Sequence, residues 1–368
     1  MKNILIFGMT ENTGGVESFI MNYYRNIDKT LFHFDFLCNT HNKIAYEEEI
    51  INSGSKIFKF TARNKNFLKY KKQLNEIFKM HAKNYDCIWV NINSLANIDY
   101  LKLANKYGIK KRIIHSHNSQ NMDSFARGLL HRINRFFIER YATDFFACSK
   151  EAANWFYKKK IIDKVKIIKN AIDVKKFIFN SENRNEIRKY FNLENSFVIG
   201  NIGRFHFQKN QDFILDIFKE FLKKHSNTKL VLIGKGEDEI KLKQKAELLD
   251  ISNNCLFVGV QNNIEKWLSM FDILLFPSLF EGLPLTLLEA QANGLPVLAS
   301  SVISKEVKLN DNFIFYNLEA NVQKWADEII YIKEHLQRIN NDILQKIFIE
   351  NGYDIKTEVK KIEKILAE

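Results

Sequence analysis

Two glutamates eight residues apart, Glu281 and Glu289, are the side chains in this sequence whose spacing first suggests chemistry. Glu281 follows an apolar run, 273–276, that is typical of a buried β-strand and ends at a proline. Glu289 lies inside an apolar helical pattern that begins near Leu285 and stops at an Asn-Gly pair. Ligands of open parallel sheets bind where the strands end, so both carboxylates are candidates for a ligand site.

A second polar group follows the predicted strand 197–202, in the segment that runs from Gly203-Arg204 to Lys209-Asn210. Arginine can fork onto two oxygens and lysine adds a compact charge, so two cations five residues apart suit a diphosphate. A solvated loop is the alternative. No Asp-x-Asp pair is present to hold a divalent metal on such a group. Arg204 and Lys209 are therefore expected to replace the charge of a metal, and no cofactor is expected.

Two further segments in the first half of the chain could bind a ligand. His115 and His117 end a predicted strand, 112–116, and could serve as metal ligands, a base or hydrogen-bond donors to a sugar; one buried and one exposed histidine is the alternative. No further ligands stand at a spacing that suits zinc. Gly14-Gly15 follows a first strand, 4–7, and would let backbone N–H groups approach an anion, although many such pairs are simple turns.

The elements that must position these residues alternate between strand and helix along the chain. This alternation predicts an α/β fold with two doubly wound, parallel, Rossmann-like halves and a cleft between them. The predicted strands are 4–7, 34–38, 56–60, 87–91, 112–116, 145–148, 165–169, 197–202, 229–233, 255–258, 273–276 and 296–299. The Asn- and Glu-rich stretch 181–196 interrupts the alternation and is the predicted linker between domains 1–180 and 197–352. The stretch 353–368 forms an amphipathic C-terminal helix.

The amino-acid composition limits the classes of protein to which this chain can belong. The chain has 368 residues, of which 46% are hydrophobic and 27% charged, as in an ordinary globular protein. It contains no apolar run long enough for a transmembrane helix, and its start lacks the pattern of a signal peptide. The cysteines, Cys38, Cys87, Cys148 and Cys255, are far apart, which indicates neither a disulfide framework nor a zinc site and suggests a reducing cytoplasm.

The net charge of +12 is unevenly distributed. Residues 1–196 contain 34 Lys and Arg against 19 Asp and Glu, whereas residues 197–368 contain 21 against 24. The basic half could face nucleic acid, an anionic membrane or a phosphorylated substrate, unless AT-rich coding alone explains its lysines. The predicted helix 126–141 places arginines beside an apolar stripe, which suits an interfacial helix; an ordinary core-packed helix is the alternative.

Several of these segments together resemble one family over nearly the whole chain. Glu281 and Glu289 resemble the E-x7-E motif of retaining glycosyltransferases of the GT-B fold, family GT4. Gly203-Arg204 with Lys209-Asn210 is similar to that family's phosphate-binding loop, and Gly14-Gly15-Val16-Glu17 to its glycine loop. Asn170-Ala171-Ile172-Asp173 is similar to its Asn-Gly-Ile-Asp segment, with alanine in the glycine position. The segment around His117 and Lys305-Glu306-Val307 further suggest the bacterial capsule and exopolysaccharide branch.

The resemblance implies roles in binding a nucleotide-sugar donor. Glu289 would hold the ribose hydroxyls and Glu281 the hydroxyls of the donor sugar. The backbone N–H groups of Leu285 and Thr286 would face the diphosphate at a helix start. The last helix would pack back on the first domain.

The same resemblance implies further contacts with the donor. Arg204 and Lys209 would neutralise the leaving diphosphate. His117 would touch the donor sugar, with His115 less clearly assigned. The loop that begins at Gly259 would border the base, and the loop with Gly14 and Gly15 would also face the donor.

The resemblance implies a retaining, metal-independent transfer, in which the departing phosphate serves as base. UDP is the expected nucleotide, with GDP open, and the acceptor would be a glycan or an undecaprenyl-diphosphate-linked sugar. A cytoplasmic enzyme held peripherally at an anionic membrane would explain the basic first half. Open alternatives are a UDP-sugar 2-epimerase or a phosphorylase of the same fold, a non-catalytic sugar-nucleotide-binding partner subunit, and a nucleic-acid-binding protein. The near-neutral second half weakens the last of these, so no nucleic-acid partner is expected.

Overall fold

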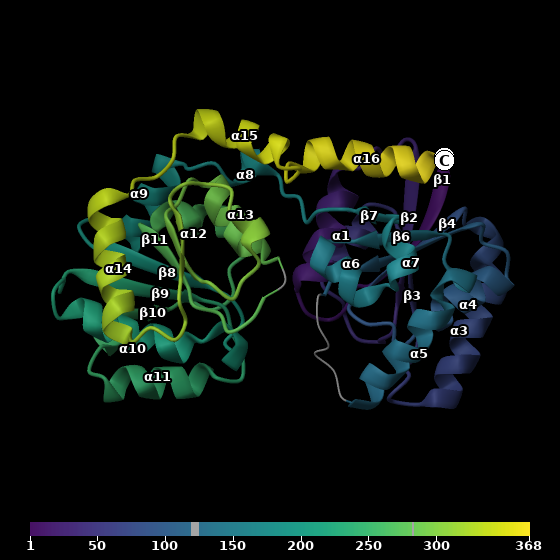
Figure 1. Ribbon diagram of the computed structural model, residues 1–368, viewed down its shortest axis with the longest axis horizontal. Helices are drawn as coiled ribbons and strands as arrows, with labels where there is room; N and C mark the ends of the chain where they lie inside the picture. Colours follow the sequence, from purple (N-terminus) through teal and green to yellow (C-terminus); the bar gives the residue numbers. More distant parts are fainter. Residues whose placement is uncertain (119–124, 282) are drawn as a thin grey trace. The chain divides into compact units, whose positions relative to one another are not determined.

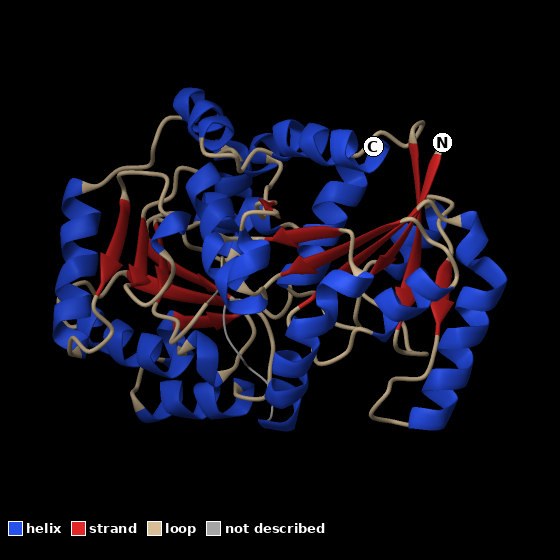
Figure 2. Ribbon diagram, turned by 45° about the vertical axis from the view of Figure 1, so that its right-hand side comes forward, coloured by secondary structure: helices blue, strands red, loops and turns tan. Residues whose placement is uncertain are grey.

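The computed structural model describes residues 1–118, 125–281 and 283–368. These residues form two compact units (Figure 1). The first unit comprises Met1–Ala171 together with Ile355–Glu368, and the second comprises Ile172–Asp354. Both units consist of a parallel sheet with helices on its faces (Figure 2).

The sheet of the first unit has the strand order β3-β2-β1-β4-β5-β6-β7, and all its paired strands are parallel. The order reverses between β1 and β4, which is where doubly wound sheets bind ligands. Its strands are β1 (Lys2–Phe7), β2 (Phe32–Cys38), β3 (Ile57–Lys59), β4 (Cys87–Ile92), β5 (Lys111–Ser116), β6 (Asp144–Ala147) and β7 (Val165–Ile167).

Helices cover both faces of this sheet because alternate strand residues point to opposite sides. Leu5 and Val90 pack into the core under α3 to α6, whereas Ile4 and Trp89 pack into the core under α1 and α16. The helices are α1 (Gly15–Asn26), α2 (Glu47–Asn52), α3 (Phe67–His81), α4 (Asp99–Lys106), α5 (Phe125–Tyr141), α6 (Lys150–Phe156), α7 (Lys159–Ile162) and α16 (Ile355–Ala367), with a 3₁₀ turn at Ala82–Asn84.

The second unit repeats the plan with the strand order β10-β9-β8-β11-β12-β13, again parallel throughout. The order reverses between β8 and β11. Its strands are nearly all buried apolar residues, as expected for a sheet covered on both faces. They are β8 (Phe197–Ile202), β9 (Thr228–Ile233), β10 (Cys255–Phe257), β11 (Ile273–Phe276), β12 (Val297–Ser300) and β13 (Phe313–Tyr316).

The helices of the second unit pack on two apolar clusters, one on each face of the sheet. Val231 and Phe276 contribute to one cluster, and Leu232 and Leu275 to the other. The helices are α8 (Val174–Phe177), α9 (Ser181–Tyr190), α10 (Gln211–Leu222), α11 (Glu239–Leu248), α12 (Ile264–Met270), α13 (Leu285–Ala292), α14 (Val322–His335) and α15 (Asn341–Glu350), with 3₁₀ turns at Phe207–Lys209, Ser252–Asn254 and Lys305–Val307.

The α/β fold with two Rossmann-like parallel sheets is confirmed, but some boundaries differ from those predicted. The stretch 181–196, predicted as a linker, contains α9, and the two units instead divide at 171/172 and 354/355. Arg184 and Arg188 of α9 both pair with Asp272 at 2.6 Å, which ties this polar stretch to the second unit. Strand β13 was not predicted. The C-terminal helix α16 belongs to the first unit, where it contacts α1.

Candidate functional site

In the second unit, loops at the carboxyl ends of neighbouring strands hydrogen-bond to one another. The Gly234 N–H donates to the Gly259 carbonyl at 2.9 Å, and the Phe205 N–H donates to the Lys235 carbonyl at 3.1 Å. Gly234 has φ +142°, and a Cβ there would lie 2.0 Å from the Gly203 carbonyl oxygen. Only glycine permits so close an approach. The loops after β8, β9 and β10 therefore form one connected edge.

Lys209 and Glu281 meet at this edge. Their Nζ and Oε1 atoms lie 2.5 Å apart, although 72 residues separate them in the sequence. Both side chains are largely buried, with 18% and 10% of their surfaces exposed. The Lys209 stem runs alongside Gly203, and its ammonium lies 4.9 Å from the centre of the Phe276 ring. Lys209 is thus held in place by packing as well as by charge.

Arg204, the other predicted cation, is exposed and pairs with a carboxylate that the sequence did not single out. Its Nη2 lies 3.0 Å from Oε2 of Glu237, in the loop after β9. His206 Nε2 lies 3.5 Å from the other oxygen of Glu237. The pKa of Glu237 is lowered, first by a hydrogen bond from its own backbone N–H and then by Arg204 and His206. Arg204 is therefore on the same edge but free to exchange partners with solvent anions.

Glu289 occupies the fifth position of α13, the helix that follows Glu281. The side chain is half-buried, and burial raises its pKa to about 7. Lys176 of α8 lowers that pKa, whereas Glu265 of α12 raises it. Lys176 Nζ and Glu265 Oε2 lie 3.7 Å apart. The sequence did not point to Lys176 or Glu265, because they belong to separate helices.

The first turn of α13 contains Leu285 and Thr286, whose N–H groups were predicted to face a diphosphate. Pro284 is the N-cap residue, and no side chain of a described residue caps the helix there. The first N–H groups of a helix have no partner within the helix, so this turn offers donors and the positive end of the helix dipole. Gly259, predicted to border a base, has φ +70°, a conformation that favours glycine.

In the first unit, His117 lies directly after β5 and contacts Asn91 of β4. Its Nε2 is 2.9 Å from Asn91 Oδ1. The Asn91 amide nitrogen donates to the carbonyls of Phe7 and Trp89, which leaves Oδ1 as the acceptor and places the proton of His117 on Nε2. Burial lowers the pKa of His117 to about 3, so the ring is neutral. Asn91 is a positioning residue that the sequence did not reveal.

His115 is completely buried among aromatic rings. The ring of Trp89 stacks on it at 6.1 Å, that of Phe19 meets it edge-on at 4.8 Å, and that of His117 lies 4.1 Å away. Neither ring nitrogen has a partner among the described residues. Burial lowers the pKa of His115 well below its usual value. Of the two histidines, His117 is therefore the one nearer the sheet edge.

The glycine pair at the start of α1 lies beside the buried carboxylate of Glu17. The Gly14 N–H donates to Glu17 Oε2 at 3.1 Å, and the Thr10 hydroxyl donates to Glu17 Oε1 at 2.5 Å. Glu17 is buried, and burial raises its pKa. Glu17 thus caps the start of α1 through its side chain, as in one half of a capping box, and the Gly14 N–H is already occupied. A Cβ at Gly15 would meet nothing within 4 Å, so sterics do not require glycine there.

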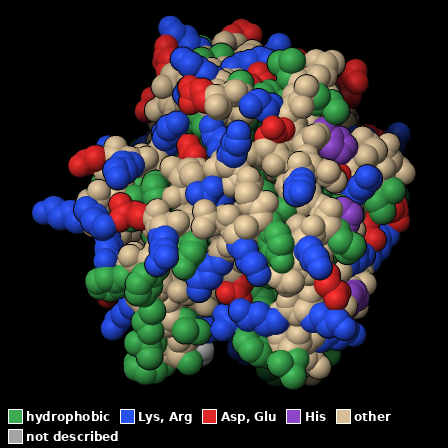
Figure 3. Space-filling view, turned by 90° about the vertical axis from the view of Figure 1, so that its right-hand side faces the viewer, with side chains coloured by type: hydrophobic (Ala, Val, Ile, Leu, Met, Phe, Trp, Pro, Cys, Tyr) green, Lys and Arg blue, Asp and Glu red, His purple; other side chains and the backbone are tan. Residues whose placement is uncertain are grey.

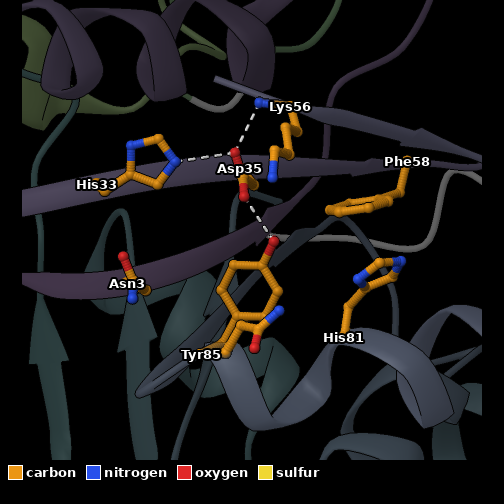
Figure 4. A pocket seen from close by; sticks show the side chains of 8 residues that line it. Asn3, His33, Asp35, Lys56, Phe58, His81 and Tyr85 are labelled. Atoms are coloured by element: carbon orange, nitrogen blue, oxygen red, sulfur yellow. Dashed lines mark hydrogen bonds and ion pairs between the residues drawn. The ribbon is translucent and has the colours of Figure 1, made fainter. Parts of the chain in front are cut away.

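A small cavity of about 170 Å³ lies at the opposite, amino-terminal edge of the first sheet (Figure 4). At its centre the buried Asp35 accepts from the Tyr85 hydroxyl at 2.6 Å and from the Lys56 N–H at 2.6 Å. His33 Nε2 lies 3.1 Å from the same carboxylate. These contacts join the starts of β2 and β3 to the segment before β4, so Asp35 has a structural role.

No group of three or more His, Cys, Asp or Glu side chains suited to a metal ion occurs in the described part of the chain. All four cysteines, Cys38, Cys87, Cys148 and Cys255, are buried. No helix in the described ranges is long and apolar enough to cross a membrane.

Two glycosyltransferase families match this chain. The description "Glycosyl transferases group 1" matches residues 182–365, and "Glycosyltransferase Family 4" matches residues 13–176. Among solved structures, HepE of Anabaena in complex with UDP and glucose superposes with a TM-score of 0.80 at 18% identity, over 100% of both chains. The fold is therefore the GT-B fold of glycosyltransferases.

Proteins with similar sequences are also named as glycosyltransferases. EpsF of Bacillus subtilis (strain 168), named as a glycosyltransferase, is 28% identical over 367 residues, which covers 94% of this chain and 95% of EpsF. The capsular polysaccharide biosynthesis glycosyltransferase CapH of Staphylococcus aureus is 26% identical and covers 96% and 95%. A UDP-Gal:α-D-GlcNAc-diphosphoundecaprenol α-1,3-galactosyltransferase of Escherichia coli is 24% identical and covers 82% and 80%. This chain belongs to the group 1 glycosyltransferases, with a family 4 amino-terminal domain.

Proposed function

We propose that this glycosyltransferase moves a sugar from a UDP-sugar to a glycan or a lipid-diphosphate-linked sugar during the synthesis of a cell-surface polysaccharide, with retention at the reacting carbon. The observation that carries the proposal is the Lys209–Glu281 pair, which lies at the carboxyl edge of the second sheet just before α13 and Glu289. The relatives named for capsule synthesis and for a UDP-galactose donor with a diphosphoundecaprenol-linked acceptor support the substrate classes.

The diphosphate of the donor is assigned to Arg204, Lys209 and the first turn of α13. Arg204 is exposed, and its ion-pair partner among the described residues is the exposed Glu237, a kind of ion pair that is weak in water. A diphosphate carries more charge than one carboxylate and can accept both guanidinium N–H groups, so it would displace Glu237. Two cations and a helix start would thereby stabilise the charge of the leaving group, and the reaction is proposed to need no metal.

The donor's sugars are assigned to the two glutamates. Glu289 lies on α13 with its carboxylate half-buried, and the ionised form can accept hydrogen bonds from two ribose hydroxyls. Glu281, held by Lys209, would accept from hydroxyls of the transferred sugar. The loop at Gly259 would border the base. His117, Gly14 and Gly15 of the first unit are assigned to the donor by resemblance alone.

The proposed chemistry begins when the bond between the sugar's anomeric carbon and the phosphate oxygen breaks, with both electrons leaving on the oxygen. The acceptor hydroxyl attacks the same face of the sugar and forms the new bond from its oxygen. Its proton passes to the departing phosphate oxygen. Lys209 stabilises charge that develops only in this transition state, which is the kind of interaction that accelerates a reaction.

The test is a thermal-shift comparison of UDP, GDP and ADP with the intact chain, because a ligand that binds only the folded state raises its melting temperature. UDP should give the largest shift, and Lys209→Ala should reduce it strongly. Lys346→Ala is the matched control, since Lys346 is an exposed lysine of the same unit whose ion pair is 3.8 Å long. No shift with any nucleotide, or an equal shift in Lys209→Ala, would overturn the assignment.

A further inference from the structure

Two loop segments at the carboxyl edge of the second sheet lie side by side. One is the 3₁₀ turn after β8 and the other is the loop after β11, and the strand order reverses between these two strands. The Leu279 N–H donates to the Gln208 carbonyl, and the side-chain amide nitrogen of Gln208 donates to the Phe280 carbonyl, both at 2.9 Å. The ion pair of Lys209 and Glu281 joins the same two segments. Backbone and side-chain contacts therefore fix the surroundings of this ion pair.

An aromatic pair projects from these two segments. The ring centres of Phe207 and Phe280 lie 5.9 Å apart, and Phe207 is 61% exposed. Phe205, two residues earlier, is completely buried in the core of the unit, whereas Phe207 takes no part in that core. Leu279 adds a third apolar side chain, which is 39% exposed. Exposed apolar side chains that cluster in this way mark binding surfaces, whereas single ones do not.

Polar groups accompany this aromatic pair. The ring of His206 lies 4.3 Å from that of Phe207, and its Nδ1 accepts from the Gln208 N–H at 3.3 Å. The proton of the neutral ring is therefore on Nε2, which faces Glu237 at 3.5 Å. The carboxylate of Glu281 directly follows the second phenylalanine in the sequence. Apolar rings with a few hydrogen-bonding groups beside them are typical of sites for small ligands.

The first unit also exposes apolar side chains, but in different surroundings. Among the described residues of α5 only His131 and Ile138 are buried, so the alternative of a core-packed helix is wrong for most of its length. Phe125 and Phe136 of this helix are 88% and 65% exposed, and the Lys158 ammonium lies 3.1 Å from the centre of the Phe136 ring. Hydrophobic side chains project at the lower end of the view in Figure 3, with Lys and Arg side chains beside them. The aromatic pair of the second unit instead lies beside hydrogen-bonding groups, which suits an uncharged ligand with hydroxyls.

We propose that Phe207 and Phe280 form a platform on which a pyranose ring of the acceptor stacks during transfer. One face of a pyranose presents largely C–H groups, which pack against an aromatic ring, while the hydroxyls at its rim remain free for polar side chains. The inference rests on the proposed function, in which Glu281 holds the transferred sugar and Lys209 the leaving diphosphate. An acceptor that attacks from the face where the phosphate leaves must lie beside both of these groups, and the aromatic pair does so.

The parts of the donor fit this platform less well. A diphosphate is charged and gains nothing from an apolar ring. A uracil base can stack on such a ring, but it is assigned to the loop at Gly259, which follows β10, and β9 separates β10 from β8 in the sheet. The transferred sugar is held by its own diphosphate and by Glu281. A sugar of the acceptor is the group that remains.

The test is the binding of methyl α-glucoside, methyl α-galactoside and methyl N-acetyl-α-glucosaminide to the intact chain in the presence of UDP, measured by saturation-transfer NMR. At least one of these pyranosides should bind, with the strongest saturation on the C–H protons of one ring face. Phe207→Ala should weaken that binding about tenfold, because the part of the aromatic ring that the sugar covers is lost. Phe207→Tyr keeps the ring and should bind like the unchanged chain, whereas Phe207→Leu should bind nearly as weakly as Phe207→Ala.

A second readout separates this inference from the nucleotide assignment. The thermal shift with UDP should be the same in the unchanged chain and in all Phe207 variants. Tyr190→Ala is the matched control and should alter neither measurement, since Tyr190 is an exposed aromatic residue at the end of α9 in the same unit.

Three outcomes would overturn the platform and leave the proposed function standing. They are binding of none of the pyranosides, equal binding by Phe207→Ala or Phe207→Leu, and a UDP shift that is lost in Phe207→Ala, because the base would then lie on the ring. The absence of any UDP shift in the unchanged chain would overturn the proposed function, and this inference with it.

Discussion

The carboxyl edges of the two parallel sheets have the same strand order but differ in charge: one carries ion pairs and the other neutral rings. In the second unit the polar side chains are charged and paired, as in Lys209 with Glu281 and Arg204 with Glu237. In the first unit His115 is buried, His117 is partly buried and both are neutral, and the positive charge lies instead on the outer helices. A diphosphate is anionic and is bound best by charged side chains, whereas an uncharged sugar can be bound by hydrogen bonds from a neutral ring. One topology thus presents charged side chains at one edge and neutral rings at the other.

Removing Lys209 is the change expected to have the largest effect on the charged edge. Lys209→Ala should lower kcat/KM for the UDP-sugar by about 100- to 1,000-fold, because it removes charge stabilisation at the leaving group and leaves Glu281 unpaired. Steady-state assays with acceptor measure this loss, and Lys346→Ala serves as control. A loss confined to KM would mean that Lys209 binds donor and transition state equally well.

Glu289→Gln should stabilise the ligand-free chain, with a dependence on pH that identifies the cause. The pKa of Glu289 is 4.5 in the unfolded state and is raised to about 7 in the folded state. Folding therefore becomes less favourable as the pH rises above 4.5. Glutamine removes this penalty, which amounts to about 3 kcal/mol at most above pH 7. Denaturant titrations at pH 5 and pH 8 should give a much larger gain at pH 8 than at pH 5. An equal gain at both would assign it to packing.

At the edge of the first sheet, His117 should make the stability of the protein depend on acidic pH. The pKa of His117 is lowered to about 3, so stability is present above the unfolded pKa of 6.5 and is lost as pH falls below it. Between pH 6.5 and pH 5 this loss amounts to about 2 kcal/mol, and His117→Gln should remove that slope while costing some stability at all pH values. Unfolding measured from pH 7 to pH 5 tests this. An unchanged slope would mean that His117 titrates normally.

Freeing Arg204 is expected to have the smallest effect. Glu237→Gln removes the carboxylate that competes for the guanidinium, so UDP should bind about two- to fivefold more tightly, as expected for a weak exposed pair. Calorimetric titration with UDP measures the change. Glu247→Gln, in the same unit at the end of α11, is a control. Weaker binding by Glu237→Gln would indicate that Glu237 positions Arg204 rather than competing with the ligand.

Local patterns were sufficient to predict most of the fold and to single out candidate residues at the edge of the second sheet. The alternation of apolar runs located every strand except β13, whose residues 313–316 end in a half-buried edge of the sheet and so lack a uniform apolar signal. The segments of Lys209, Glu281 and Glu289 were recognisable because a strand end, a loop and a helix start follow one another closely. The stretch 181–196 was wrongly predicted to be a linker because its composition is polar. Two of its polar residues, Arg184 and Arg188, instead form ion pairs with Asp272 within the second unit.

The remaining contacts could not be predicted because they join residues that are far apart in the sequence. Glu237 reaches Arg204 across 33 residues, and His117 reaches Asn91 across 26. Nothing local marks Asn91 as the group that sets the tautomer of a histidine. The capping of Gly14 by Glu17 is local, but the same Gly-Gly pattern is equally compatible with an anion site.

The central claim, that the charged edge of the second unit binds a nucleotide diphosphate through Glu289 and its neighbours, is tested most directly by the pH dependence of UDP affinity. The dissociation constant should be measured from pH 5.5 to pH 8.5 for the unchanged chain and for Glu289→Gln. Affinity of the unchanged chain should fall as pH drops below about 7, where the carboxylate becomes protonated, and the variant should bind weakly with no such dependence. Equal affinities and parallel pH profiles in the two proteins would contradict the account.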